Sequence, residues 1–283
     1  TEAERAFAEA LAIGEKIHGK NSDVYARLQQ QRSDFLRSLG QVQDAEPMAR
    51  RAFEQARKNF GETHVLYFEA ASTLALVLAE RGRMKEALEL FAAVTRHRLE
   101  VHGPVHHRYA EALRNEATCY RGLADYAKAA DLAEQAVRIN EAANAGPKLR
   151  FEHLNELGLI YYAQGRHEDA ERVFHRALHS LEQAVGLEHE DVATAYNNMA
   201  LVHEGQARYA LAEVEYQKAA DIAKSCLGNQ HPDYFLKLHN LAHLRVYQGR
   251  YPEAIGLYEQ VLAGWKKSYG EVHDKICSCL KGL

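Results

Sequence analysis

The stretch that decides the fold is Gly165-Arg166-His167-Glu168-Asp169-Ala170, because near copies of it recur along the chain. Two close copies are Gly82-Arg83-Met84-Lys85-Glu86-Ala87 and Gly249-Arg250-Tyr251-Pro252-Glu253-Ala254. Three looser copies keep the small first residue and the final alanine, and they run from Gly40 to Ala45, from Ala124 to Ala129 and from Ala207 to Ala212. Successive copies lie 41 or 42 residues apart. A period in this range indicates stacked supersecondary repeats.

Each copy is typical of a tight turn between two helices. Glycine tolerates the positive φ with which a chain often leaves a helix. Pro252 then falls in the first turn of the next helix, where a missing N–H costs little. The alanine is predicted to lie where the two helices approach closely, because a larger side chain there would force them apart.

A second pattern, Gly-x-x-His, marks the other end of each unit. It occurs at Gly61 to His64, Gly103 to His106, Gly186 to His189, Gly228 to His231 and Gly270 to His273. The glycine ends one helix and the polar segment begins the next. We interpret these histidines as local hydrogen-bonding residues of a turn rather than as metal ligands.

These marks predict an all-α protein, a right-handed α-α superhelical solenoid of tandem helix-turn-helix repeats. We expect one solenoid over residues 1–283, with a lone helix at 1–17 and a truncated seventh repeat at 273–283. Six helix pairs are predicted at about 22–60, 65–102, 106–143, 149–186, 191–227 and 232–269. Because the chain begins Thr1-Glu2, without Met, we interpret it as a piece of a longer protein.

Leu157-Gly158-x-x-Tyr161 followed by Ala170-x-x-x-Phe174 matches the tetratricopeptide repeat (TPR) signature. The period of 41 or 42 residues is longer than the usual 34 of this repeat. This longer period and the segment Tyr196-Asn197-Asn198-Met199-Ala200 resemble the TPR domain of kinesin light chains. The resemblance implies a cytoplasmic, non-catalytic adaptor that binds a linear peptide of a protein partner in a concave groove, related to kinesin-based transport, the cytoskeleton or the cilium. Two alternatives stay open: an assembly subunit that uses its outer faces or ends, and a regulatory module of a larger enzyme.

In this family the first helix of each pair lines the groove. The predicted groove residues are polar or charged, and they are Arg114, Asn115, Asn155, Glu156, Asn197, Asn198, His239, Asn240 and His243. Asparagine is a poor helix former, so its recurrence needs a reason. Amides can hold the backbone of an extended peptide. A concave face that is simply solvated would explain them as well.

His239, His243 and Tyr247 share one helix face by their spacing. They predict either a pH-sensitive aromatic pocket or packing, and a metal site lacks a third ligand. The family's carboxylate clamp for chaperone tails needs basic residues in the repeat after Asn115, where Glu152 and Glu156 stand instead. We therefore predict no binding of chaperone carboxylate tails.

The composition narrows the partners further. The formal charge is −4, whereas nucleic acid binding is typical of a strong basic excess. No run of about 20 apolar residues predicts membrane insertion. The four cysteines, including Cys277 and Cys279, are too sparse for a disulfide framework and are interpreted as incidental thiols. Since no catalytic or phosphate-binding motif occurs, we expect no enzyme activity, no cofactor and no metal.

Overall fold

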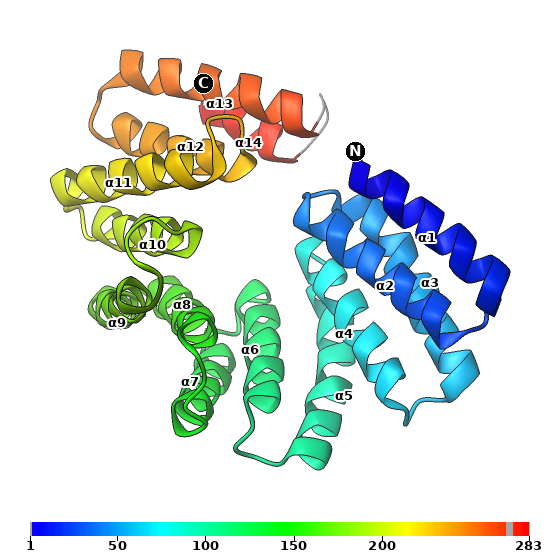
Figure 1. Cartoon of the computed structure of the whole chain (residues 1–283). Coiled ribbons are helices and arrows are strands. Elements are labelled where there is room, and N and C mark those ends of the chain that lie inside the picture. The colour runs from blue at the N-terminus through cyan, green and yellow to red at the C-terminus, as the bar shows by residue number, and fades with distance from the viewer. Residues whose placement is uncertain (1, 270–273, 283) are drawn as a thin grey trace. The chain divides into compact units, whose positions relative to one another are not determined.

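The computed structural model describes residues 2–269 and 274–282, and within them the chain forms fourteen α-helices and no β-strand (Figure 1). The all-helical prediction is confirmed. The chain divides into two compact units, one up to Ile139 and one from Asn140. The boundary falls in the last turn of a helix, and the two units are described separately below. A single continuous solenoid stays a prediction.

Unit 1 contains the lone helix and the first three pairs. Its helices are α1 (Glu2–His18), α2 (Asp23–Ser38), α3 (Val42–Phe60), α4 (Val65–Glu80), α5 (Met84–His102), α6 (His107–Gly122) and α7 (Tyr126–Ala142). The helix ends lie within a few residues of the predicted ranges.

Unit 2 contains three pairs and a short last helix. Its helices are α8 (Pro147–Ala163), α9 (His167–Val185), α10 (Glu190–Gly205), α11 (Tyr209–Leu227), α12 (Pro232–Tyr247), α13 (Tyr251–Tyr269) and α14 (Asp274–Gly282). The start of the predicted seventh repeat, at residue 273, lies outside the described residues. None of the described helices is both long and apolar enough to cross a membrane.

The turn inside each pair has the predicted form. Gly40, Gly82, Gly165 and Gly249 have φ between 72° and 74°. The alanines that follow are Ala45, Ala87, Ala129, Ala170, Ala212 and Ala254, and none is more than 2% exposed. The prediction that they lie where two helices meet is confirmed.

The histidines of the Gly-x-x-His loops cap the first helices. The Nδ1 atoms of His64, His106, His189 and His231 accept the backbone N–H two residues later, at 3.1 to 3.2 Å. Ser22 does the same for α2 with its hydroxyl oxygen, which accepts from the Tyr25 N–H at 3.2 Å. These groups satisfy donors that a helix start leaves unpaired. The interpretation as local hydrogen-bonding residues is confirmed, except that His273 lies outside the described residues.

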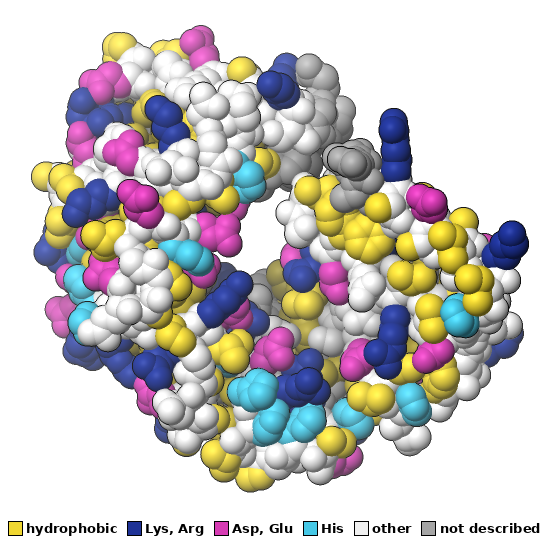
Figure 2. Space-filling view, viewed as in Figure 1, with side chains coloured by type: hydrophobic (Ala, Val, Ile, Leu, Met, Phe, Trp, Pro, Cys, Tyr) yellow, Lys and Arg dark blue, Asp and Glu magenta, His cyan; other side chains and the backbone are white. Residues whose placement is uncertain are grey.

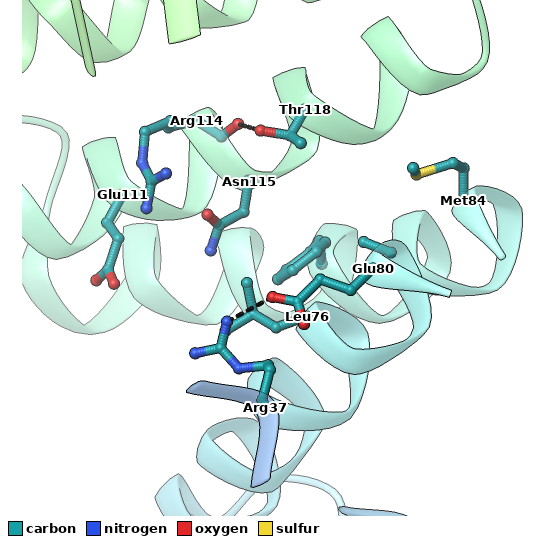
Figure 3. A pocket seen from close by; sticks show the side chains of 10 residues that line it. Arg37, Leu76, Glu80, Met84, Glu111, Arg114, Asn115 and Thr118 are labelled. Atoms are coloured by element: carbon teal, nitrogen blue, oxygen red, sulfur yellow. Dashed lines mark hydrogen bonds and ion pairs between the residues drawn. The ribbon is translucent and has the colours of Figure 1, made fainter. Parts of the chain in front are cut away.

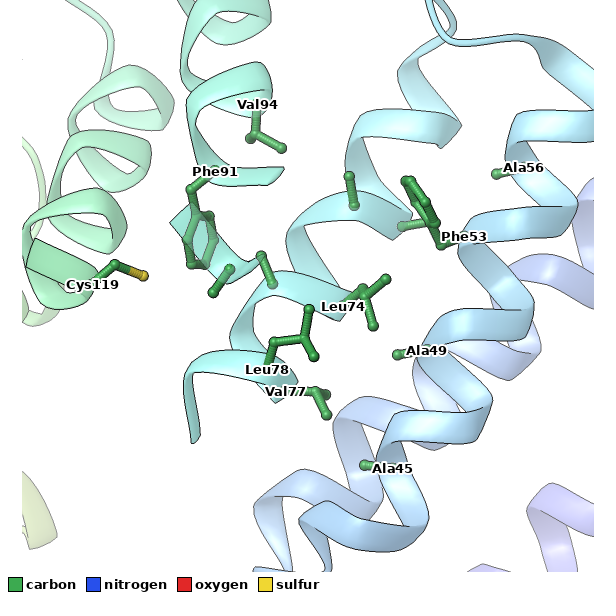
Figure 4. Close-up of a cluster of buried hydrophobic side chains, with 14 of the residues drawn as sticks. Ala45, Ala49, Phe53, Ala56, Leu74, Val77, Leu78, Phe91, Val94 and Cys119 are labelled. Carbon is green, nitrogen blue, oxygen red and sulfur yellow. The ribbon is translucent and has the colours of Figure 1, made fainter. Parts of the chain in front are cut away.

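Apolar packing between consecutive helices forms the core of each unit. In unit 1, Phe53 of α3, Leu74 and Leu78 of α4, and Phe91 of α5 belong to one buried cluster (Figure 4). In unit 2, the largest buried side chain is Trp265 of α13. Burying each such side chain stabilises the fold by about 1.5–3 kcal/mol. The first helices are thereby held in fixed positions, and their remaining faces carry the polar residues.

Two turns hold alanine in a conformation that suits glycine, because Ala124 and Ala207 have φ of 61° and 59°. The left-handed region costs a residue with a Cβ about 1–2 kcal/mol, and glycine avoids this cost. Part of that advantage is offset, because glycine loses more conformational freedom than alanine when the chain folds. We expect Ala207→Gly to raise the free energy of unfolding by about 0.5–1 kcal/mol, measured by urea denaturation. Gly82→Ala, the reverse change at an equivalent turn, should lower it. A loss of stability in Ala207→Gly would contradict this account.

Candidate functional site

Unit 1 has a pocket of about 450 Å³ on the side of its first helices (Figure 3). Helices α2, α4 and α6 contribute to it, together with side chains of α5. The lining residues are Arg37, Leu76, Ala79, Glu80, Met84, Phe91, Glu111, Arg114, Asn115 and Thr118. Two predicted groove residues, Arg114 and Asn115, are therefore together in one cavity.

The pocket combines apolar side chains with charges of both signs. The Arg37 Nη1 atom donates to Glu80 Oε1 at 2.8 Å (Figure 3), and burial raises the pKa of Glu80 although Arg37 opposes this. Glu111 accepts from Arg98 Nη1 at 2.9 Å. Leu76 and Phe91 supply apolar surface. Such a site can bury an apolar group and hydrogen-bond a polar or charged one beside it.

The predicted groove asparagines of unit 2 bond to one another across successive first helices. Asn240 Nδ2 of α12 donates to Asn197 Oδ1 of α10 at 2.8 Å. Asn198 Nδ2 of α10 donates to Asn155 Oδ1 of α8 at 2.6 Å, and Asn197 Nδ2 donates to Asn198 Oδ1 at 3.2 Å. Asn197 and Asn198 are only 7% and 8% exposed. The structure gives these amides a packing role, and their role in recognition stays a prediction.

The remaining predicted residues of unit 2 divide between the core and the surface. Glu156 is buried, and His239 is half-buried with its ring 5.4 Å from Trp265 and 5.5 Å from Tyr258. Burial lowers the pKa of His239. His243 is exposed, and its Nδ1 atom lies 3.2 Å from Glu204 Oε1. The two histidines on one helix face thus have different surroundings.

His243 lies next to a carboxylate and a phenol ring. Glu204 Oε2 also accepts the Tyr216 hydroxyl at 2.8 Å, and the His243 ring meets Tyr247 edge-on at 4.9 Å. The hydrogen bond to Glu204 raises the pKa of His243. Within the described ranges, no three His, Cys, Asp or Glu side chains come together as metal ligands would. Tyr216 was not predicted as a site residue from the sequence. The one sequence feature that could have indicated it is its position on the helix that follows Glu204.

The surface charge is mixed as well. On the face shown in Figure 2, acidic, basic and histidine side chains are interspersed. This agrees with the small net charge of −4.

Tetratricopeptide repeat family models match residues 25–98, 66–142 and 149–225, and further models of the same repeat match 237–274 and 115–178. Together they cover well over half of the chain. The chain belongs to the tetratricopeptide repeat family. No curated protein sequence matches it at a significant level. The repeats make the chain a protein-interaction scaffold, a class of module that is generally non-catalytic.

Solved structures share this fold. A Podosopora anserina protein assigned as a kinesin light chain, with nearly identical TPR-like repeats, is 19% identical with a TM-score of 0.58 over 70% of this chain and 94% of that one. A Rap protein complexed with Competence and Sporulation Factor is 17% identical with a TM-score of 0.74 over 99% and 81%. NprR in complex with its cognate peptide NprX is 15% identical with a TM-score of 0.67 over 99% and 78%. The resemblance to TPR proteins of the kinesin light chain type is confirmed for the fold.

The amide contacts predict a stability effect. Asn198→Ala removes the donor to Asn155 and the acceptor for Asn197. It leaves the Asn197 amide unsatisfied in a nearly buried place and the Asn155 oxygen without this donor in a partly exposed one. We expect the free energy of unfolding to fall by about 1–3 kcal/mol, measured by urea denaturation. Asn229→Ala, at an exposed loop position, is the matched control and should change it by less than about 0.5 kcal/mol. Equal effects of the two changes would contradict the packing role.

The His243–Glu204 contact predicts a pH effect. Because the folded-state pKa of His243 is raised, its stabilising contribution is fully present below the unfolded pKa of about 6.5 and is lost as pH rises through the folded pKa. The stability difference between the wild type and His243→Gln should therefore be larger at pH 6 than at pH 8.5. Denaturation curves at several pH values test this. A difference that stays constant over this range would show that the ion pair does not stabilise the fold.

Proposed function

We propose that this chain is a non-catalytic adaptor that holds a linear segment of a partner protein along its first helices. The observation that carries the proposal is the pocket of about 450 Å³ in unit 1, which contains Arg114 and Asn115. Its volume falls within the range of about 300–1,000 Å³ that is usual for ligand sites. It can therefore receive a side chain of the bound segment.

The chemistry of the pocket suits a peptide better than a small apolar ligand. Leu76 and Phe91 can bury an apolar side chain, while Arg37, Glu80 and Arg114 can hydrogen-bond the polar groups of a backbone beside it. In unit 2, Asn155, Asn240 and His243 keep part of their surface exposed on the first helices. These residues are the proposed contacts within unit 2.

Two of the comparisons support this proposal in different ways. The complex of NprR with its cognate peptide NprX supports a peptide as the partner. The kinesin light chain likeness supports a cytoplasmic cargo adaptor related to kinesin-based transport and the cytoskeleton. The resemblance described above makes the cilium a further proposed setting for the same activity.

A second candidate function is assembly through the outer faces. Apolar side chains are exposed on second helices of unit 2: Val214 of α11 is 52% exposed, and Tyr251 and Ile255 of α13 are 60% and 45% exposed. Exposed apolar residues favour contact with another protein surface. An assembly subunit would use these residues rather than the pocket.

Substitution in the pocket tests the adaptor. Arg114→Glu reverses a charge in the pocket, so we expect at least a tenfold loss of partners in a pull-down from cell extract read by mass spectrometry. Arg51→Glu, an exposed position on second helix α3, is the matched control and should retain them. Thermal melts establish that both variants fold. Partners retained by Arg114→Glu but lost from Val214→Asp would overturn the adaptor in favour of assembly through the outer faces.

A further inference from the structure

Glu204, near the end of α10, is a carboxylate enclosed by aromatic side chains. Its side chain is only 11% exposed, and Oε2 accepts the Tyr216 hydroxyl of α11 at 2.8 Å. The ring of Tyr162, on α8, lies beside Gly205, since a Cβ there would be 3.1 Å from Tyr162 Cε2. Tyr162 therefore flanks Glu204 from the preceding first helix.

The next first helix, α12, supplies another ring. Tyr247 stacks parallel to Tyr209 of α11, with ring centroids 6.2 Å apart and planes 7° apart. Tyr247 is also 57% exposed. Tyr247 contacts His243, which is the partner of Glu204, so an exposed aromatic surface begins one side chain away from the carboxylate.

Burial and then the negative charge of Glu204 contribute to the raised pKa of nearby tyrosines. Burial is the main cause of the raised pKa of Tyr162, and the charge of Glu204 adds to it. The same two causes, in the same order, raise the pKa of Tyr216. Burial also raises the pKa of Tyr258, with smaller contributions from Cys279 and then from Glu204. The only cation within hydrogen-bond distance of Glu204 among the described residues is His243, at 3.2 Å, when its ring is protonated. This imidazolium is itself exposed and can be displaced.

We propose that Glu204, Tyr162, Tyr209 and Tyr247 form a site for a cationic side chain, lysine or arginine, of the bound segment. This proposal rests on the proposed function, because it identifies one residue type of the peptide that the first helices hold. A carboxylate supplies charge complementarity, and the faces of tyrosine rings attract a cation. An acidic side chain would be repelled, and an apolar one would cover Glu204 without supplying a cation for its charge.

Binding at this site competes with the protonation of His243. The groups next to His243 are Glu204 of α10 and, on its own helix, His239 and Tyr247. Tyr209 and Tyr216 of α11 contact Tyr247 and Glu204, and Tyr162 of α8 interacts electrostatically with the same two residues. Glu204 is the acid among them. When pH rises, His243 loses its proton and Glu204 becomes available. The affinity for a cationic side chain should therefore rise from pH 6 to pH 8.

The test begins with an mRNA-displayed library of random 12-residue peptides selected on the whole chain at pH 7.5. We expect the selected peptides to contain a lysine or arginine whose replacement by citrulline or norleucine weakens binding at least tenfold. Glu204→Gln keeps an acceptor for the Tyr216 hydroxyl and should cost a similar factor. Glu259→Gln, at an exposed position on α13, is the matched control and should change the affinity less than twofold. Fluorescence anisotropy with labelled peptides measures each affinity.

The possible outcomes distinguish failure of the cation site from failure of the adaptor function. Peptides that lose affinity with Arg114→Glu, yet bind Glu204→Gln as tightly as the wild type, would overturn the cation site and leave the adaptor intact. A library that yields no peptide sensitive to any first-helix substitution would overturn the adaptor and the cation site together. We expect Glu204→Gln to lose the contact with the lysine or arginine. We also expect the wild type to bind the peptide more tightly at pH 8 than at pH 6.

Discussion

The close approach of the two helices in each pair is the constraint on which the rest of this structure depends. Six alanines occupy the crossing points, and none is more than 2% exposed. Gly158 shows how little room remains, because a Cβ there would lie 2.6 Å from the Phe174 ring. Since interiors are close-packed, a larger side chain at these places would separate the helices. The regular spacing of the first helices, and hence of the polar groups on them, follows from this contact.

The elements set by local chemistry could be predicted from the sequence. The turn glycines, the crossing alanines and the capping histidines each depend on a few neighbouring residues, so their patterns could be interpreted without knowledge of the stacking. The amide partners could not be found in this way. Asn155 with Asn198, Asn197 with Asn240, and Gln30 with Thr73 are each 43 residues apart. The repeat is 42 residues long, so a pairing offset by one residue becomes visible only when the helices are stacked.

These amide pairs also change how the candidate site is understood. An amide that is nearly buried must find a partner, and an unsatisfied one costs about 1–3 kcal/mol. The pairs thereby favour one register between neighbouring first helices. The polar groups left for a ligand are then mainly charged and aromatic ones. The proposed cation site could have been indicated in part by the sequence. Tyr162 and Glu204 are 42 residues apart, so they occupy equivalent places on α8 and α10.

A second network of ion pairs joins some of the consecutive helix pairs. Arg83 with Glu46, Arg208 with Glu171, and Arg250 with Glu213 are each 37 residues apart. At the last of these, hydrogen bonding by Arg245 is the main cause that lowers the pKa of Glu213 to about 2.

By sequence, the equivalent positions hold Leu88 and Asp125 for the second and third pairs, and Ala130 and Arg166 for the third and fourth, and neither combination can form this contact. The pocket of unit 1 lies at the junction of the second and third pairs, since Met84 and Phe91 of α5 and Arg114 of α6 line it. Other polar contacts join α5 and α6 at this junction, because Arg98 Nη1 donates to Glu111 Oε2 at 2.9 Å and to the Arg108 carbonyl oxygen at 3.0 Å. Glu111 lines the pocket, so the interface beside the pocket is held by an ion pair that a bound charged group could compete for.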